Sequence, residues 1–499
     1  MLFGYDTASF GGILANAGFI DQFGTLDPTT GEWAFASNDT SLLSSIPFVG
    51  KFLGCLLAGP AIERFGHRMV FFGLSVISIL GIIIEITAAD SANGSGRFAQ
   101  FIVGRVIVYI SVGLVEVDVT TYQAEIVPAP FRGLVVVSLQ LFLNAGTILA
   151  TGVNKAFSDY TTAVGWKVVT AIQFIFPLLM IAFTLFIPSS PRWLLSKDRT
   201  EDAVASLSRL RSQHEVDSGH CEIEIAAIRE ALQEHVHKAS WWSLVRGTNL
   251  RRTALTLVYY FFQQTTGQAF VSTYQTTFYR ENGYASNAFL YPVINSVLSF
   301  LSVVPAMYMV DRLGRRWTLL ISYSLQAFWM YLLAGLGERA NKTGTQSNTI
   351  VAAFMLFAFS YNMGSASIPY LLGSEIPNSA VREKTQAIGT SWNVVWAFVT
   401  NYSIPFMIDN IHFKVGWVFG SISIVAFAFT FMFLPETKGR ALEEIDAIFK
   451  VKFNPFRSSE VQYAEAEYRV GVLEGEKEKE DLKPESTWNE RSTTDVSHV

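Results

Sequence analysis

The stretch Asp311-Arg312-Leu313-Gly314-Arg315-Arg316 is a short charged segment between two apolar runs. A similar stretch, Glu63-Arg64-Phe65-Gly66-His67-Arg68, lies 248 positions earlier, also between apolar runs. Both have the order acid, Arg, apolar residue, Gly, base, Arg. A Glu followed seven residues later by Arg also occurs twice, as Glu125 and Arg132 and as Glu375 and Arg382. A repeat of about 250 residues predicts two tandem copies of one multi-helix unit.

The composition indicates a membrane protein. Of the 499 residues, 50% are hydrophobic and only 16% are charged, whereas a soluble protein usually carries about 25% charged residues. The net charge of -5 comes largely from the acidic C-terminal tail, so it does not indicate a partner. The amino terminus lacks the basic region of a cleavable signal peptide.

Several functional classes are excluded by what the sequence lacks. The two cysteines, Cys55 and Cys221, are expected to be unpaired, and no CxxC motif or His cluster suggests a metal. No phosphate-binding loop is present, which argues against ATP-driven chemistry, and no basic patch with interleaved aromatic residues suggests nucleic acid. We therefore expect neither an enzyme nor a cofactor.

Apolar runs predict the membrane-spanning helices. A span needs roughly 20 mainly apolar residues, and the sequence contains twelve such runs. They lie near residues 1–20, 42–61, 69–88, 98–122, 133–154, 166–187, 253–279, 286–310, 317–336, 350–373, 385–408 and 414–434. The predicted fold is therefore an all-α membrane protein of two six-helix pseudo-repeats, an arrangement typical of transporters.

Four regions follow from this division. The first six-helix half covers 1–187 and the second covers 253–434. Between them, the loop 188–252 contains apolar residues at helical spacing, which predicts short amphipathic helices at the membrane surface or, equally, a solvated linker. The tail 435–499 is predicted to be disordered from about residue 457, because it is polar and poor in aromatics.

The distribution of Lys and Arg predicts the orientation. The even-numbered connections between spans hold most of the basic residues, so these connections and both termini are expected to be cytoplasmic. Three N-x-[ST] sequons, at Asn38, Asn93 and Asn341, fall in odd-numbered connections, where glycosylation outside the cell is possible.

The ordered set of motifs resembles the sugar porters of the major facilitator superfamily, in particular the fungal hexose and α-glucoside branch. The resemblance covers residues 1 to about 450. It is carried by Gly4-Tyr5-Asp6-Thr7, Gly104-Arg105, Tyr122-Gln123-Ala124-Glu125, Pro191-Arg192-Trp193-Leu194, Gln263-Gln264-Thr265-Thr266-Gly267, Ser374-Glu375-Ile376-Pro377 and Pro435-Glu436-Thr437-Lys438-Gly439, together with Asp311 to Arg316.

The resemblance implies a sugar site. Sugar hydroxyls both donate and accept hydrogen bonds, so amides suit them, and aromatic faces suit the C–H side of the ring. Positions that contact sugar in the family are occupied here by Gln140, Gln263, Gln264, Tyr370 and Asn393. The alternative role of these residues is helix–helix hydrogen bonding.

Other positions depart from the family pattern. Ala269 and Ser299 occupy positions where the family has Asn, Thr147 occupies one where it has Gln, and Tyr370 occupies one where it has Trp. We therefore do not assign a particular sugar.

The same resemblance implies proton coupling through Asp6 and Arg105, which are charged residues within spans. We expect Asp6 to accept the proton and to pair with Arg105 when ionised; the alternative is a static ion pair. Only five residues precede Asp6, which would place it near the cytoplasmic edge, whereas the resemblance implies a deeper position. This conflict suggests that the true start of the first helix is missing from the chain.

Charged residues at helix ends are expected to form a cytoplasmic gate, in which Glu–Arg pairs between the two halves close the inner side. The expected gate residues are Arg64, Arg68, Glu125, Arg132, Asp311, Arg312, Arg315, Arg316, Glu375 and Arg382. Ser190 replaces a Glu that is usual in the family. Glu85 and Asp118 receive no role.

The sequence thus predicts a sugar transporter that works by alternating access, a monomeric sugar:proton symporter of the plasma membrane. The alternatives are a passive sugar facilitator, a sensor that binds sugar without transporting it, and a carrier of polyols or sugar acids.

Parallel repeats make a direct prediction about residues 64 and 312, because equivalent loops of parallel units lie on one face of the membrane. Arg64→Cys and Arg312→Cys, each in a chain without Cys55 and Cys221, should react with an impermeant maleimide from the cytoplasmic face alone. Labelling of the two positions from opposite faces would contradict the parallel arrangement.

Overall fold

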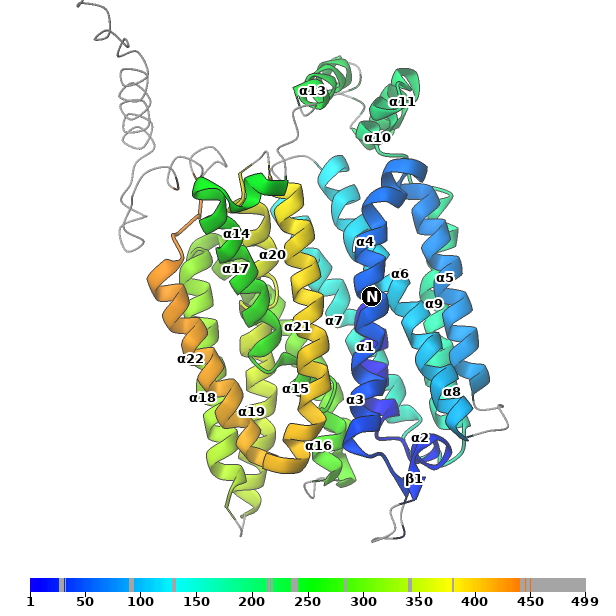
Figure 1. Cartoon of the computed structure of the whole chain (residues 1–499), viewed down its shortest axis with the longest axis vertical. Coiled ribbons are helices and arrows are strands. Elements are labelled where there is room, and N and C mark those ends of the chain that lie inside the picture. The colour runs from blue at the N-terminus through cyan, green and yellow to red at the C-terminus, as the bar shows by residue number, and fades with distance from the viewer. Residues whose placement is uncertain are drawn as a thin grey trace, which may run out of the picture.

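The computed structural model is a bundle of long helices that run nearly parallel to its long axis (Figure 1). It describes residues 1–26, 31, 33–88, 94–127, 132–211, 213, 216, 219–234, 241–281, 285–339, 343–378, 381–439, 445 and 449. Most of the predicted tail, including everything from residue 457, lies outside the described residues. A single two-stranded ribbon, β1 (Thr25–Leu26) with β2 (Trp33–Ala34), is the sheet found in the described part.

The first half contains the helices that precede the central loop. They are α1 (Leu2–Ile13), α2 (Ala17–Phe23), α3 (Ser37–Ser45), α4 (Pro47–Phe65), α5 (His67–Thr87), α6 (Gly94–Ile126), α7 (Arg132–Ala156), α8 (Val164–Ala171), η3 (Ile172–Phe174) and α9 (Ile175–Thr184). Gly66, with φ of 75°, makes the sharp turn between α4 and α5, a conformation that glycine adopts without steric cost.

The second half repeats this order. It contains α14 (Gly247–Thr265), α15 (Gln268–Ser272), α16 (Gln275–Glu281), η6 (Ala285–Asn287), α17 (Leu290–Arg312), α18 (Arg315–Gly337), α19 (Gly344–Met363), α20 (Ile368–Glu375), α21 (Arg382–Ile411), η7 (His412–Lys414) and α22 (Val415–Phe433). Gly314, with φ of 94°, makes the turn between α17 and α18 that corresponds to Gly66.

Helix packing shows the same pseudo-repeat. In the first half α1 packs on α7 and α5 packs on α9, and in the second half α14 packs on α21 and α18 packs on α22. The halves meet where α7 contacts α17 and where α21 contacts α3 and α4. The predicted architecture of two six-helix units is therefore confirmed.

Within the described residues, eight stretches are long and apolar enough to cross a membrane. The last of them, Lys384–Phe433, contains both α21 and α22. The remaining passes are made by α1, by α7 and by the chain from α14 to α16, which complete six passes in each half.

Three of the predicted spans are interrupted rather than continuous. The run 1–20 breaks where Asn16 caps α2 by accepting a hydrogen bond from the Gly18 N–H at 3.0 Å. The run 253–279 breaks at Gly267, with φ of 109°, and the run 350–373 breaks between α19 and α20. Irregular backbone at membrane depth is tolerated where it is buried in protein or lines a cavity.

Helix α1 begins near mid-height of the bundle and runs away from the central loop (Figure 1). Asp6 therefore does not lie at the edge of the bundle next to that loop, as the count of preceding residues had suggested. Its side chain is 1% exposed.

The central loop forms helices beyond one end of the bundle, at the top of Figure 1. They are α10 (Pro191–Ser196), α11 (Thr200–Leu210), α13 (His220–Glu234) and the 3-10 turn η5 (Trp241–Val245). A small apolar core joins Leu194, Leu207 and Ile225, so these helices pack on one another and are not a plain linker. Cys55 and Cys221 are not joined in a disulfide, as predicted.

Glycines allow α4 and α6 to pack with their backbones in contact. A Cβ atom added at Gly50 would lie 2.2 Å from the Val106 carbonyl oxygen, and one added at Gly113 would lie 2.2 Å from the Lys51 carbonyl oxygen. Small residues at such crossings provide the van der Waals contact that holds membrane helices together.

This contact predicts the effect of adding one methyl group. Gly50→Ala should destabilise the protein by about 1–3 kcal/mol, because the helices must separate to admit the Cβ atom. Gly59→Ala is the matched control, since nothing lies within 4 Å of a Cβ atom at that position of the same helix. Thermal unfolding in detergent measures both; equal melting temperatures would contradict the close contact.

Candidate substrate and coupling sites

The three amide residues predicted in the second half lie together. Asn393 of α21 donates to the Gln263 side-chain oxygen at 2.7 Å and accepts from the Gln264 side chain at 3.0 Å. The Asn393 amide also lies 3.2 Å from the Tyr260 carbonyl oxygen. Gln263 and Asn393 are buried, whereas Gln264 is partly exposed. The structure thus brings together three of the residues that the sequence singled out, and their role in binding sugar stays a prediction.

The broken helices position this cluster. Gln263 donates at 2.6 Å to the carbonyl oxygen of Ala366, which lies in the break between α19 and α20. Tyr361 at the end of α19 donates to the Gln263 carbonyl oxygen at 3.0 Å. A carbonyl group released by the break is thus satisfied by a side chain of the cluster, as a buried polar group requires.

Gln140 does not join this cluster but forms a second one between the halves. Its side chain donates to Asn362 of α19 at 3.1 Å and to Asn144 at 3.4 Å. Asn144 also donates to the Ser299 carbonyl oxygen at 3.0 Å. Asn144 and Asn362 were not predicted, although an amide within an apolar span is the same signal that singled out Gln140.

Tyr370 packs edge-to-face on Tyr260, with the ring centroids 5.5 Å apart. Its hydroxyl group donates to the Glu116 carboxylate of α6 at 3.1 Å. Glu116 in turn forms an ion pair with Lys51 of α4, with the two charged atoms 2.7 Å apart. Sequence reasoning missed both charged residues, and the missed signal is a charge within an apolar span.

Asp6 and Arg105 form an ion pair inside the first half. The Asp6 carboxylate lies 3.3 Å from an Arg105 Nη atom and accepts from the Gln173 amide at 3.2 Å. Arg105 also donates to the Leu43 carbonyl oxygen and to the Tyr109 hydroxyl group. Both members are at most 2% exposed, so each charge depends on the other for compensation.

Glu85 is buried beside this pair, in α5. A Cβ atom at Gly104, the residue before Arg105, would lie 2.7 Å from the Glu85 side chain. One carboxylate oxygen of Glu85 has no hydrogen-bond partner among the described residues.

Comparison with known proteins gives the family. The model of the family described as "Sugar (and other) transporter" matches residues 1–449. The chain belongs to the sugar transporter family. It is 30% identical over 467 residues to the high-affinity glucose transporter ght2 of Schizosaccharomyces pombe, covering 92% of this chain and 86% of that protein. The high-affinity fructose transporter ght6 of the same yeast is 29% identical, covering 100% and 91%.

Solved structures confirm the fold. The proton:xylose symporter XylE of the major facilitator superfamily, bound to 6-bromo-6-deoxy-D-glucose, superposes with a TM-score of 0.74 at 23% identity, covering 90% of this chain and 96% of that chain. The inward-open form of XylE from E. coli superposes with a TM-score of 0.73 over the same shares. The transporter is thus a multi-pass membrane protein and not an enzyme. Among its described residues, no cluster of His, Cys, Asp and Glu could hold a metal ion.

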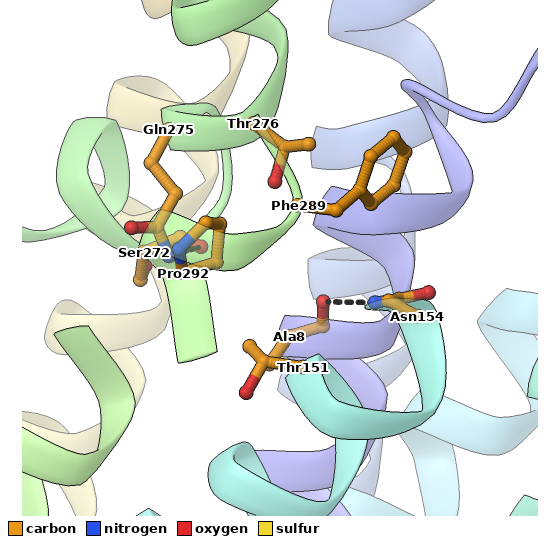
Figure 2. Close-up of a pocket in the computed structure, with 8 residues that line it drawn as sticks. All are labelled: Ala8, Thr151, Asn154, Ser272, Gln275, Thr276, Phe289 and Pro292. Atoms are coloured by element: carbon orange, nitrogen blue, oxygen red, sulfur yellow. Dashed lines mark hydrogen bonds between the residues drawn. The ribbon is translucent and has the colours of Figure 1, made fainter. Parts of the chain in front are cut away.

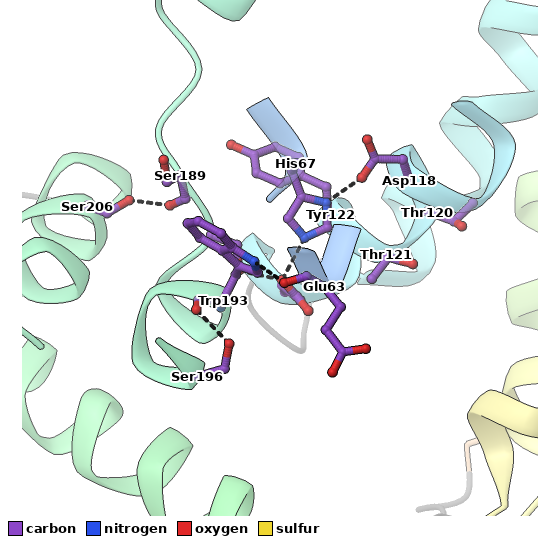
Figure 3. A network of polar contacts seen from close by, with 12 residues as sticks. Glu63, His67, Asp118, Thr120, Thr121, Tyr122, Ser189, Trp193, Ser196 and Ser206 are labelled. Atoms are coloured by element: carbon purple, nitrogen blue, oxygen red, sulfur yellow. Dashed lines mark hydrogen bonds and ion pairs between the residues drawn. The ribbon is translucent and has the colours of Figure 1, made fainter. Parts of the chain in front are cut away.

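The first half of the transporter carries a polar network near the central loop (Figure 3). His67 is 1% exposed and lies between two carboxylates, with Asp118 at 2.5 Å and Glu125 at 3.1 Å from its ring nitrogens. Ser190 donates to Glu125, in the place where the family usually has Glu. Asp118, which received no role from the sequence, is therefore a member of this network.

The second half carries the equivalent network, with an arginine in place of the histidine. Arg315, which corresponds to His67 in the repeat, forms a two-point contact with Glu375 at 2.7 and 3.2 Å. Glu375 also accepts from Thr437 at 2.7 Å. The Glu436 carboxylate accepts from the backbone N–H groups of Arg315 and Arg316 at the start of α18, where the helix dipole favours a negative charge.

The remaining expected gate residues are distributed over the same helix ends. Arg68 donates to the carbonyl oxygens of Thr184 and Leu185. Arg64 and Arg312 lie over the rings of Phe65 and Tyr308. Asp311 is exposed, Arg382 begins α21, and Arg132 begins α7 with its side chain outside the description.

The ion pairs seen here join residues of the same half, Arg315 to Glu375 and His67 to Asp118 and Glu125. Glu125 and Glu375 therefore have partners on neighbouring helices of their own unit, and the expected Glu–Arg pairing between the halves stays a prediction. Of the three sequons, Asn38 lies exposed in α3, while Asn93 and Asn341 are outside the described residues.

A small polar pocket lies between the two halves (Figure 2). Its walls are formed by α1 and α7 on one side and by the chain from α15 to α17 on the other. Asn154 donates to the Ala8 carbonyl oxygen at 3.1 Å at one wall, and Ser272, Gln275 and Thr276 provide further polar groups.

The first-half network predicts the cost of removing its imidazole. His67→Ala should destabilise the transporter by about 3 kcal/mol, because Asp118 and Glu125 would be left buried without their shared partner. Arg64→Ala is the control, since Arg64 is an exposed residue three positions before His67 in the same motif. Its guanidinium group lies over the Phe65 ring. Thermal unfolding in detergent at neutral pH checks the difference; a His67→Ala protein as stable as the control would show that the two carboxylates do not need the imidazole.

Proposed function

We propose that the transporter carries a neutral sugar together with a proton across the plasma membrane by alternating access. The names of two relatives, a glucose transporter and a fructose transporter, support a hexose as the sugar. The fold shared with a proton:xylose symporter supports proton coupling as the driving force. Both termini and the central loop are assigned to the cytoplasm by the positive-inside rule.

The sugar binds at the two amide clusters between the halves. Amide groups of Gln263, Gln264 and Asn393 now satisfy one another, and Gln140 does the same with Asn362. Each amide offers both donors and acceptors, so sugar hydroxyls can replace these mutual bonds without leaving buried groups unpaired. Transport then requires the halves to open alternately on either side of this site.

Coupling rests on one observation, which is the buried Asp6–Arg105 pair. When ionised, Asp6 ties α1 to α6 through Arg105 and to η3 through Gln173. A proton on the carboxylate removes the charge that Arg105 and Gln173 bind, so α1 is released from this contact. The charge networks of Glu125 and Glu375 act at the inner end, where their contacts must change when that end opens.

A passive facilitator is the second candidate. The complete pairing of Asp6, with donors on both carboxylate oxygens, suits a static structural contact equally well. Proton coupling separates the two candidates.

Asp6→Asn decides between them. In proteoliposomes with an inward proton gradient, the native transporter should accumulate labelled glucose, whereas Asp6→Asn should only equilibrate it, because the Asn side chain cannot take up the proton. The measurement is the ratio of internal to external sugar at acid and neutral external pH.

Asp21→Asn is the matched control, an exposed acid on α2, and should accumulate sugar normally. Accumulation by Asp6→Asn that still follows the pH gradient would contradict the coupling role. Absence of uptake of glucose, fructose, xylose and maltose by the native protein would contradict sugar transport itself.

A further inference from the structure

A buried ion pair lies beside the proposed sugar site on the side of the first half. Lys51 lies at the middle of the stretch Ser37–Phe65, which is apolar enough to cross a membrane. Its side chain is 3% exposed and forms an ion pair with Glu116 at 2.7 Å. Moving two charges into a low-dielectric region is costly even when they pair, so a pair at this depth indicates a role beyond packing.

The backbone is built to bring these two residues together. The contact of α4 with α6 at Gly50, Gly54 and Gly113 removes side-chain bulk on either side of the pair. The Lys51 ammonium group also lies 4.2 Å from the centre of the Phe3 ring. Lys51 is thus fixed from two sides, while the Glu116 side chain remains 20% exposed.

The Glu116 carboxylate also contacts the second half. Its carboxylate accepts the Tyr370 hydroxyl group at 3.1 Å, and Tyr370 packs on Tyr260, whose carbonyl oxygen accepts from Asn393 of the amide cluster. The Tyr370 hydroxyl group of the second half therefore binds a carboxylate of the first half. Only Tyr260 lies between Tyr370 and the amide cluster that we propose binds sugar.

We propose that Glu116, held by Lys51, is a hydroxyl-binding subsite for the sugar, and that Tyr370 occupies it when no sugar is bound. The inference rests on the proposed sugar transport. A carboxylate accepts from a sugar hydroxyl group as it now accepts from the phenol, and the ammonium group can donate to the neighbouring hydroxyl oxygen. The pair carries no net charge, so it favours a neutral sugar over a sugar acid.

The test compares Glu116→Gln with Tyr370→Phe in proteoliposomes of the full chain. Hydrogen bonds to charged groups contribute enough that Glu116→Gln should raise the KM for glucose about 10- to 100-fold. Tyr370→Phe keeps the aromatic face but removes the competing hydroxyl group, so it should lower the KM, opposite in direction to Glu116→Gln. If Glu116 and Tyr370 served only to fasten the halves together, both substitutions would remove the same hydrogen bond and shift the KM alike, which would overturn the proposal.

A series of monodeoxy glucoses identifies the hydroxyl group concerned. One analogue should compete about 10-fold less well than glucose in the native transporter, and this difference should disappear in Glu116→Gln. Gluconate should not compete in either protein. A loss that is equal for all analogues, or competition by gluconate as strong as that by glucose, would contradict the subsite.

Two further variants separate failure of the subsite from misfolding and from failure of the proposed sugar transport. The double variant Lys51→Met, Glu116→Gln leaves no unpaired charge, so it should fold, and its KM should be raised at least as much as that of Glu116→Gln because it also lacks the ammonium donor. Gln264→Ala tests the amide cluster: if it impairs transport while Glu116→Gln leaves the KM and the analogue series unchanged, only the subsite is refuted. If the native protein moves no sugar, the proposed function itself is refuted.

Discussion

The structure depends on the requirement that every polar group inside the bilayer finds its partner within the protein. An unsatisfied group in hydrocarbon costs several kcal/mol, so charges and broken helices can occur only where side chains compensate them. Gln263 satisfies a carbonyl group in the break between α19 and α20, and Arg105 compensates Asp6. The groups best suited to bind a polar substrate are the same ones that the fold needs to satisfy itself.

At the helix ends nearest the central loop, the two halves make equivalent contacts with different chemical groups. In the second half Arg315 donates two hydrogen bonds to Glu375 from its planar, permanently charged guanidinium group, a geometry suited to carboxylates. In the first half His67 holds Asp118 and Glu125 through its two ring nitrogens. Ser190 binds Glu125, whereas its counterpart region in the second half supplies Glu436 to the start of α18. The repeat has kept the positions of these contacts while the groups that make them differ.

Much of the fold could be predicted from the sequence, because span length, apolar content and the repeated charged turns each follow from the bilayer. Gln263, Gln264 and Asn393 could each be singled out as amides within apolar runs, but their mutual hydrogen bonds could not, because these depend on how the two helices pack. The breaks at Asn16, Gly267 and the α19–α20 junction were not, since hydropathy over 20 residues averages over a local interruption. Lys51 and Glu116 were passed over because a single charge does not end an apolar run, and their pairing depends on helices that are distant in sequence.

Gln263 and Gln264 are adjacent in the sequence, yet their side chains make different contacts. Gln263 supports a broken segment through Ala366 and also meets Asn393, whereas the side chain of Gln264 is described in contact with Asn393 alone and is partly open. Loss of transport after a substitution at position 263 could therefore come either from destabilisation of the broken segment or from loss of the proposed sugar contact. Position 264 therefore offers the cleaner test of the proposed sugar contact, because a change there does not remove the support of the broken segment.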